Sequence, residues 1–357
     1  MTFNTLLFVG ASQLAFQSIG PVSWVPVANL TAKADAIVLG TVQSASNGGA
    51  VHANITVERA LKGSLVQGSS ISIIWRPPVM SSGVPPTSGS ARTERRHGLF
   101  FLQRSSGTWS LLPRMNGNIS WQETYFPTPA SSPPGVRKSA EASLPVTPAV
   151  LDRVYLELVI AIEAGASMPV NLATEFRIGP SAVLAAAFLR FLNNPKLQAV
   201  GLRGIVIAGE PAGLVAARDK YTMLSKCSGW TEFLGEITLN YLNTTPQAIR
   251  TLGQVATDVT VADDLRLAIS GALARMHTST TLPYLAQLLA DYNPALRGTA
   301  AGGMSGFANN VPIGAHEPAA GPWPYRTDET IRHIGFDPAN APFWQGWWRQ
   351  YRAKLNK

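Results

Sequence analysis

Histidine is the side chain in this sequence with the widest choice of chemistry, because it can ligate a metal or act as a general acid or base. The chain has five histidines, and no two have the i, i+4 spacing that places two ligands on one face of a helix. His316-Glu317 is followed by Pro318, which disfavours a helix there. We therefore expect no metal site and no cofactor. The histidines are His52, His97, His277, His316 and His333.

Nucleophiles and carboxylate pairs are equally scarce. Cys227 is the single cysteine, so the sequence excludes an intrachain disulfide and a cysteine-based zinc site. Asp263 and Asp264 are adjacent, and adjacent helical residues do not face each other, so we expect them as favourable charges at a helix N-terminus. Glu157 and Glu163 are expected at exposed helix positions. Since no catalytic or phosphate-binding motif occurs either, the sequence predicts no catalytic residue and a protein that is not an enzyme.

The composition predicts a folded protein of two domains. The chain has 357 residues, of which 46% are apolar and only 14% charged. At about 100–200 residues per domain, a chain of this length divides most simply into two. The net charge of +8 comes from few acids rather than many bases, and no basic stripe accompanies it, so we expect no nucleic-acid partner.

Residues 1–30 form an apolar N-terminal segment, and Lys33 is the first charged residue. The segment has the length of a signal peptide but lacks a basic start and a clear cleavage site. No stretch of the chain is long and apolar enough to predict a membrane span. Two interpretations stay open: an exported protein, periplasmic or extracellular, or a cytoplasmic protein whose apolar segment packs on the first domain.

Residues 31–123 show short apolar runs separated by turn residues, which predict a small β-domain, an antiparallel barrel or sandwich. Residues 124–147 contain several prolines among serines and alanines and are expected to be a proline-rich linker. The expected strands cover residues 35–42, 51–58, 70–75, 97–102, 108–112 and 118–121.

From residue 148 to 312 the apolar period changes to about 3.6 residues, which predicts helices. Gly, Pro or Asn separates most of them, and such short links predict helical hairpins. The expected helices cover residues 149–164, 181–192, 195–209, 213–225, 230–243, 247–257, 262–277, 281–290 and 295–308.

An internal repeat runs through this helical half. Asn194-Pro195 and Asn293-Pro294 lie three periods of about 33 residues apart, and Arg266 lies about one period before Arg297. Because a single hairpin cannot bury its apolar face alone, repeated hairpins are expected to stack. Pro195 and Pro294 then mark equivalent turns.

The repeat resembles the HEAT repeat, in the HEAT-like form common in bacterial proteins. Asp264-Leu265-Arg266 and the run from Asn293-Pro294 to Arg297 carry the resemblance, which is best over 245–310, moderate over 181–210 and weak between. It implies an all-α solenoid in which Arg266 and Arg297 are structural and bond polar groups of a neighbouring repeat. More faintly, the strand-rich part resembles OB-like or tissue-inhibitor-like β-barrel modules of exported bacterial proteins.

Residues 313–357 form an aromatic-rich tail. On a helix from residue 341, Trp344, Trp347, Trp348, Tyr351 and Leu355 share one face. The preferred interpretation is a cap on the end of the solenoid, because terminal repeats need one. The alternatives are a partner or ligand platform, for which Trp344, Trp347 and Trp348 are the candidate residues, and an interfacial membrane helix.

These features together favour a non-enzymatic protein-binding or scaffold protein, whose partner is another protein. Two alternatives of other classes stay open. The first is an enzyme similar to the bilin lyases, whose members carry HEAT-like repeats, although the β-module and the lack of recognisable bilin-site residues count against it. The second is a structural protein of the cell envelope. The sequence leaves the oligomeric state open.

Overall fold

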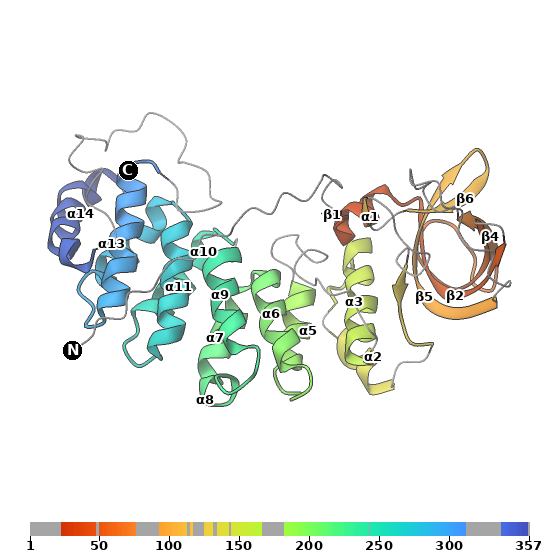
Figure 1. Ribbon diagram of the computed structural model, residues 1–357, viewed down its shortest axis with the longest axis horizontal. Coiled ribbons are helices and arrows are strands. Elements are labelled where there is room, and N and C mark those ends of the chain that lie inside the picture. The colour runs from red at the N-terminus through yellow and green to blue at the C-terminus, as the bar shows by residue number, and fades with distance from the viewer. Residues whose placement is uncertain are drawn as a thin grey trace.

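The computed structural model describes residues 23–47, 50–75, 93–112, 115–116, 125–130, 134–142, 144–165, 182–241, 243–311 and 337–355. A closed β-barrel forms its N-terminal part and a series of helices its C-terminal part, so the predicted combination of a β-barrel with a helical region is confirmed. The barrel lies at one end of the long axis of the molecule and helix α14 at the other (Figure 1).

The bounds of the elements follow the periodicity of the sequence closely. The strands are β1 (Ser23–Trp24), β2 (Ala36–Asn47), β3 (Ala50–Lys62), β4 (Ser70–Trp75), β5 (Thr93–Ser105), β6 (Thr108–Leu111), β7 (Met115–Asn116) and β8 (Phe126–Pro127). The first helices are α1 (Val27–Lys33), α2 (Pro134–Glu141), α3 (Val150–Glu163), α5 (Ala182–Phe191), α6 (Gln198–Ala208), α7 (Pro211–Asp219) and α8 (Tyr221–Leu224). The later ones are α9 (Trp230–Asn240), α10 (Pro246–Thr257), α11 (Asp263–Arg275), α12 (Leu282–Leu288), α13 (Pro294–Ala308) and α14 (Ala341–Leu355), with short 3-10 turns at Ser279–Thr281 and Pro338–Asn340.

The barrel closes because β2 pairs on both of its edges, with β3 and with β5. The ring continues through β4 and β6, which meet in parallel at Ile73 and Trp109. Gly40 and Gly98 face each other in the β2–β5 pairing. A Cβ atom on Gly98 would lie 2.6 Å from the ring of Tyr125, so only glycine lets this ring cross the strand.

Residues 36–40 of β2 and 98–102 of β5 are buried on both faces of the sheet. Val38 and Phe100 point into the barrel core, whereas Ile37, Leu99 and Phe101 belong to a second core that includes residues of α1 and α3. This accounts for the continuous apolar runs in both strands, since a strand with one wet face would alternate apolar and polar residues.

The segment predicted as a linker, residues 124–147, carries secondary structure where it is described. Tyr125 and Phe126 are fully buried and β8 pairs with β5, after which α2 packs on α3. The prolines are compatible with this because Pro127 lies in an edge strand and Pro134 opens a helix, where in both cases the missing N–H costs little. The strand expected at 118–121 lies outside the described residues.

The helices after α3 form two layers. Helices α6, α9, α11 and α13 contact one another in succession and form one layer. Helices α5, α7, α10 and α12 contact one another in the same way and form the other. The layers are joined by the pairs α5–α6, α10–α11 and α12–α13, each of consecutive helices, as the short links predict.

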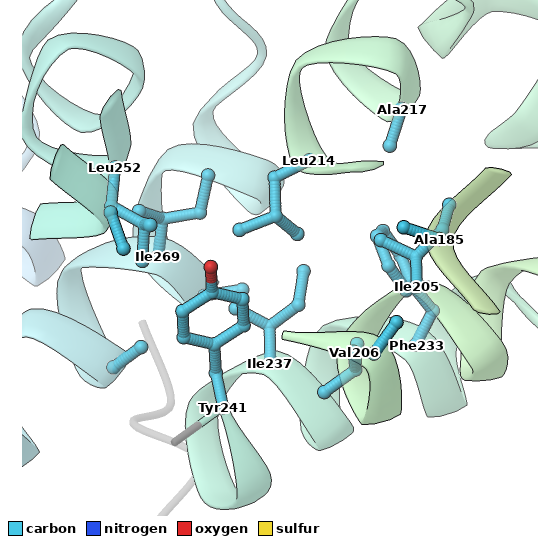
Figure 2. Packing of buried hydrophobic residues seen from close by; sticks show 14 of the residues in the cluster. Ala185, Ile205, Val206, Leu214, Ala217, Phe233, Ile237, Tyr241, Leu252 and Ile269 are labelled. Carbon is cyan, nitrogen blue, oxygen red and sulfur yellow. The ribbon is translucent and has the colours of Figure 1, made fainter. Parts of the chain in front are cut away.

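Apolar side chains fill the space between the two layers. Figure 2 shows Ile205, Leu214, Ile237 and Leu252 pointing into it, and all four are buried. Tyr241 lies among them, and its hydroxyl donates to the carbonyl of Gly209 at 2.8 Å. These residues belong to one cluster that extends from the outer face of the barrel to α14.

Glu157 contradicts the expectation of an exposed helix position, because its side chain is only 2% exposed. Arg137 of α2 donates from both terminal nitrogens to the two carboxylate oxygens, each at 2.9 Å. Arg59 of β3 contacts the same carboxylate from the barrel side. The expectation was wrong because α3 is covered by α2 on one side and by the barrel on the other, so it has little solvent face. Burial, with Arg137 nearby, lowers the pKa of Arg59.

Replacing Glu157 with alanine should strongly destabilise the protein. The variant removes the charge-assisted hydrogen bonds of Arg137 and the contact of Arg59, and leaves only Glu141, 3.6 Å from Arg137, as an anion beside the two arginines, which should cost roughly 2–3 kcal/mol. Glu163→Ala is the matched control on the same helix, since Glu163 is 19% exposed and meets Arg190 at 3.4 Å. We expect this control to lose about 1 kcal/mol or less. Urea denaturation of both variants measures the difference, and equal losses would show that the Glu157 pairs do not support the fold.

Candidate functional site

The described histidines lie far apart in the fold. His52 is exposed on β3, His97 lies on β5, and the buried His277 has its Nε2 3.2 Å from the carbonyl oxygen of Gly306. Among the described residues no group of three histidine, cysteine or acidic side chains is close enough to hold a metal ion. His316 and His333 lie outside these residues, and Cys227 is half-buried at the edge of the helical core.

His97 has the most polar surroundings of the three. Its Nε2 lies 2.8 Å from a carboxylate oxygen of Glu58. Its Nδ1 lies 3.1 Å from the carbonyl oxygen of Thr128 and 2.8 Å from the hydroxyl of the same residue. Thr41 donates to the other oxygen of Glu58 at 2.7 Å. The cluster therefore ties β2, β3 and β5 to the chain segment that follows β8.

This cluster superficially resembles a catalytic triad, but its chemistry is different. The Glu58 carboxylate and the Thr128 carbonyl only accept hydrogen bonds, whereas the Thr128 hydroxyl can donate to Nδ1 or accept from it. Thr128 is buried, at 9% exposed, so its hydroxyl offers a substrate little access and is poorly placed to act as a nucleophile. Partial burial raises the pKa of Glu58, but hydrogen bonds from Thr41 and His97 outweigh it and hold that pKa below its ordinary value. The geometry is that of a structural tie.

Arg266, predicted as a structural repeat residue, is fully buried in α11. Its Nε donates to the carbonyl of Ala256 at the end of α10, at 3.0 Å. One terminal nitrogen donates to Asp263 at 2.9 Å, and the other pairs with Asp291 in the turn before α13. The guanidinium also lies over the ring of Tyr292, 5.7 Å from its centroid. A single side chain thus links three successive helices.

The adjacent carboxylates at the start of α11 point to different partners. Asp263 accepts from the Tyr292 hydroxyl at 2.6 Å and from the Asn293 amide at 2.8 Å. These bonds, with Arg266 beside them, hold the pKa of Asp263 below its ordinary value. Asp264 accepts from the indole N–H of Trp230 at 2.9 Å, which fastens α11 to α9. Both carboxylates therefore hold neighbouring helices together in addition to standing at a helix N-terminus.

The other predicted repeat positions lie at turns. Arg297 is half-buried and donates to the carbonyls of Asp291 and Tyr292 at 2.9 and 3.0 Å, so it bonds the turn of its own hairpin. Pro294 is the first residue of α13, behind the N-cap Asn293, whose side chain accepts from the backbone of Ala295. Pro195 is exposed in the turn between α5 and α6.

The three candidate tryptophans of α14 are not equivalent. Trp344 is 0% exposed and Trp347 is 4% exposed, whereas Trp348 is only half-buried. Trp344, Trp347 and Tyr351 form a chain of ring contacts, with centroids 6.0 and 5.1 Å apart. Helix α14 contacts α12 and α13. The indole N–H groups of Trp344 and Trp347 are buried without a hydrogen-bond acceptor among the described residues.

A groove of about 650 Å³ lies along α9, α11 and α13 and reaches Pro338. Its lining is made of glycine, alanine, proline, threonine and leucine, apart from the single charged residue Arg275. A Cβ atom on Gly271 would lie 2.8 Å from the Thr238 side chain, so α9 and α11 approach closely at the floor of the groove. This volume lies within the range of about 300–1,000 Å³ that is typical of ligand sites.

A second hollow on the same layer, of about 270 Å³, lies between α6 and α9. Its charged lining residues are Arg203, Glu232 and Glu236, and Arg203 pairs with Glu236 at 3.4 Å. The layer of α6, α9, α11 and α13 thus carries two hollows of different charge. Sequence reasoning missed both, because it treated Gly271-Ala272 only as a sign of close helix packing and did not consider Arg275.

No protein-family model, curated protein or solved structure matches this chain. The HEAT-like and β-module resemblances therefore depend on the quoted residues alone.

Arg266 and Arg297 should differ clearly in their effect on stability. Arg266→Ala leaves the buried carboxylate of Asp291 without its cation, which should lower the free energy of unfolding by roughly 3–5 kcal/mol. Arg297→Ala removes hydrogen bonds to the partly solvent-exposed carbonyls of Asp291 and Tyr292 and should cost about 1 kcal/mol. Thermal and urea unfolding monitored by circular dichroism give both values. A larger loss for Arg297 would contradict the assignment of Arg266 as the central link.

Proposed function

We propose that this chain is a non-enzymatic protein-binding scaffold whose helical region is a HEAT-like α-solenoid. The observation that carries the proposal is the groove along α9, α11 and α13, which has the size of a binding site. Its lining includes no acid, histidine or cysteine, so it offers surface for binding but no base that could activate its threonine hydroxyls.

The two-layer order of the helices supports the solenoid. Each hairpin contacts chiefly the hairpins before and after it in the sequence, which is how repeat proteins bury the apolar faces of their hairpins. Arg266 supports it as well, because it bonds the end of the preceding helix and the turn of the following hairpin. The HEAT-like resemblance implies this role for the residue.

Helix α14 is proposed to cap the solenoid. Its buried face, which includes Trp344, Trp347 and Tyr351, covers apolar residues of the last hairpin that would otherwise contact water. An exposed platform or a membrane-surface helix would keep such rings on the outside. No described helix has the length and apolar character needed to cross a membrane.

The cap predicts unequal costs for the two neighbouring tryptophan positions. Trp344→Ala removes a fully buried ring and should destabilise the protein by roughly 3–5 kcal/mol. Trp348→Ala is the matched control on the same helix and should cost less, about 1–2 kcal/mol, because Trp348 is partly exposed. Melting temperatures measured by calorimetry give the comparison. If Trp344→Ala melts like the native chain, α14 does not act as a cap.

Filling the groove should remove partner binding without unfolding the protein. Ala295 is exposed at the groove edge on α13, so Ala295→Trp would project a ring into it. Ala212→Trp is the matched control, at an exposed position of α7 in the other layer. Immobilised full-length proteins are incubated with an extract of the native organism, and the bound proteins are identified by mass spectrometry. We expect at least one protein that the native chain and Ala212→Trp retain and that Ala295→Trp loses. Identical sets for all three would refute binding at this groove.

A further inference from the structure

The groove along α9, α11 and α13 carries one charge that nothing in the described structure balances. Arg275 lies in the last turn of α11 and lines the groove, whose other lining residues are uncharged. Its Nε is buried and has no hydrogen-bond acceptor among the described residues. No ion pair joins Arg275 to a described acid, so an anionic group brought to its groove-facing side would meet a cation that no described acid neutralises.

Several other arginines of the helical region pair with an acid. Arg190 pairs with Glu163, Arg203 with Glu236, and Arg266 with Asp291. The position of Arg275 at the C-terminal end of its helix favours a cation, because the carbonyl ends of the helix dipoles gather there. The fold thus tolerates the charge, and within the described residues no acid competes with a planar anion for this guanidinium.

The walls around Arg275 suit an extended chain better than a bulky ring. Gly271, Ala274, Ala295 and Gly298 have no side chain or only a methyl group, so backbone lies close to the groove surface on α11 and α13. Leu267 and two prolines add apolar contacts. Such a surface gains most from apolar side chains on a partner segment, and the guanidinium adds one directional contact.

We propose that the groove binds an apolar peptide segment of a partner protein that carries an aspartate or glutamate side chain, and that this carboxylate pairs with Arg275. The inference depends on the proposed function, since it names the occupant of the same groove. In the neighbouring hollow Arg203 offsets Glu236, and the remaining acid Glu232 disfavours the same carboxylate there, so the segment has a preferred position on the layer.

The test uses short random peptides displayed on phage and enriches those that bind the immobilised full-length protein. Peptides that also bind immobilised Ala295→Trp are removed, because they bind outside the groove. We expect the retained peptides to combine apolar residues with an aspartate or glutamate. Peptides enriched on Arg275→Met should show no preference for an acidic residue, whereas peptides enriched on Arg275→Lys should keep that preference. Arg250→Met, at an exposed position of α10, is the control and should leave the selected sequences unchanged.

A double-mutant cycle then measures the contact itself. Exchanging the acid of a selected synthetic peptide for its amide should weaken binding to the native protein about tenfold or more, and should change binding to Arg275→Met little. Fluorescence anisotropy gives the dissociation constants, and circular dichroism confirms that each variant is folded.

Three results would overturn the inference. Groove-dependent peptides without an acidic preference would refute the carboxylate while the protein-binding function stands. A complete absence of groove-dependent peptides would count against both. A dimer in light scattering that Ala295→Trp dissociates would show that a second copy of this chain fills the groove.

Discussion

One apolar core runs without interruption from the outer face of the barrel to the last described helix, and the rest of the structure depends on it. Ile37 and Phe101 belong to it at one end and Trp344 and Tyr351 at the other. No element between these ends can bury its apolar face alone, since each helix of the two layers relies on its neighbours. The barrel wall and α14 therefore cover the two ends of the same core.

Within this core, charged groups are buried at a few defined places, where they join elements that apolar packing alone would leave free to shift. Glu157 meets arginines from the barrel and from α2, and Arg266 meets the end of α10, the start of its own helix and the turn before α13. Such pairs add little net stability compared with apolar residues of the same size, but an incorrect alignment leaves a charge without a partner. They favour one relative placement of neighbouring elements over others.

The two halves of the fold could be predicted from periodicity, because strands and helices impose different spacings on apolar residues. The runs around Val38 and Phe100 and the helix pattern from residue 148 onward are examples. The burial of Glu157 could not be predicted, since it depends on the barrel and α2 both packing on α3. The groove could not be predicted either, because glycines and alanines in a helix indicate close packing whether or not a hollow remains beside them. Arg275 carried no local signal, because its significance lies in having no acidic partner among the described residues.

The pairing of β2 with both β3 and β5 has a consequence for how the chain orders itself. Ala36 must meet Leu102 across most of the barrel sequence before the ring is complete, whereas α10 and α11, or α12 and α13, meet across a few intervening residues. Closing a long loop costs more chain entropy than closing a short one, and nonlocal pairings slow the search for the native state. The largest entropy cost of loop closure during folding therefore falls on the N-terminal third of the chain. The described hairpins of the helical part form mainly through contacts between neighbours in the sequence.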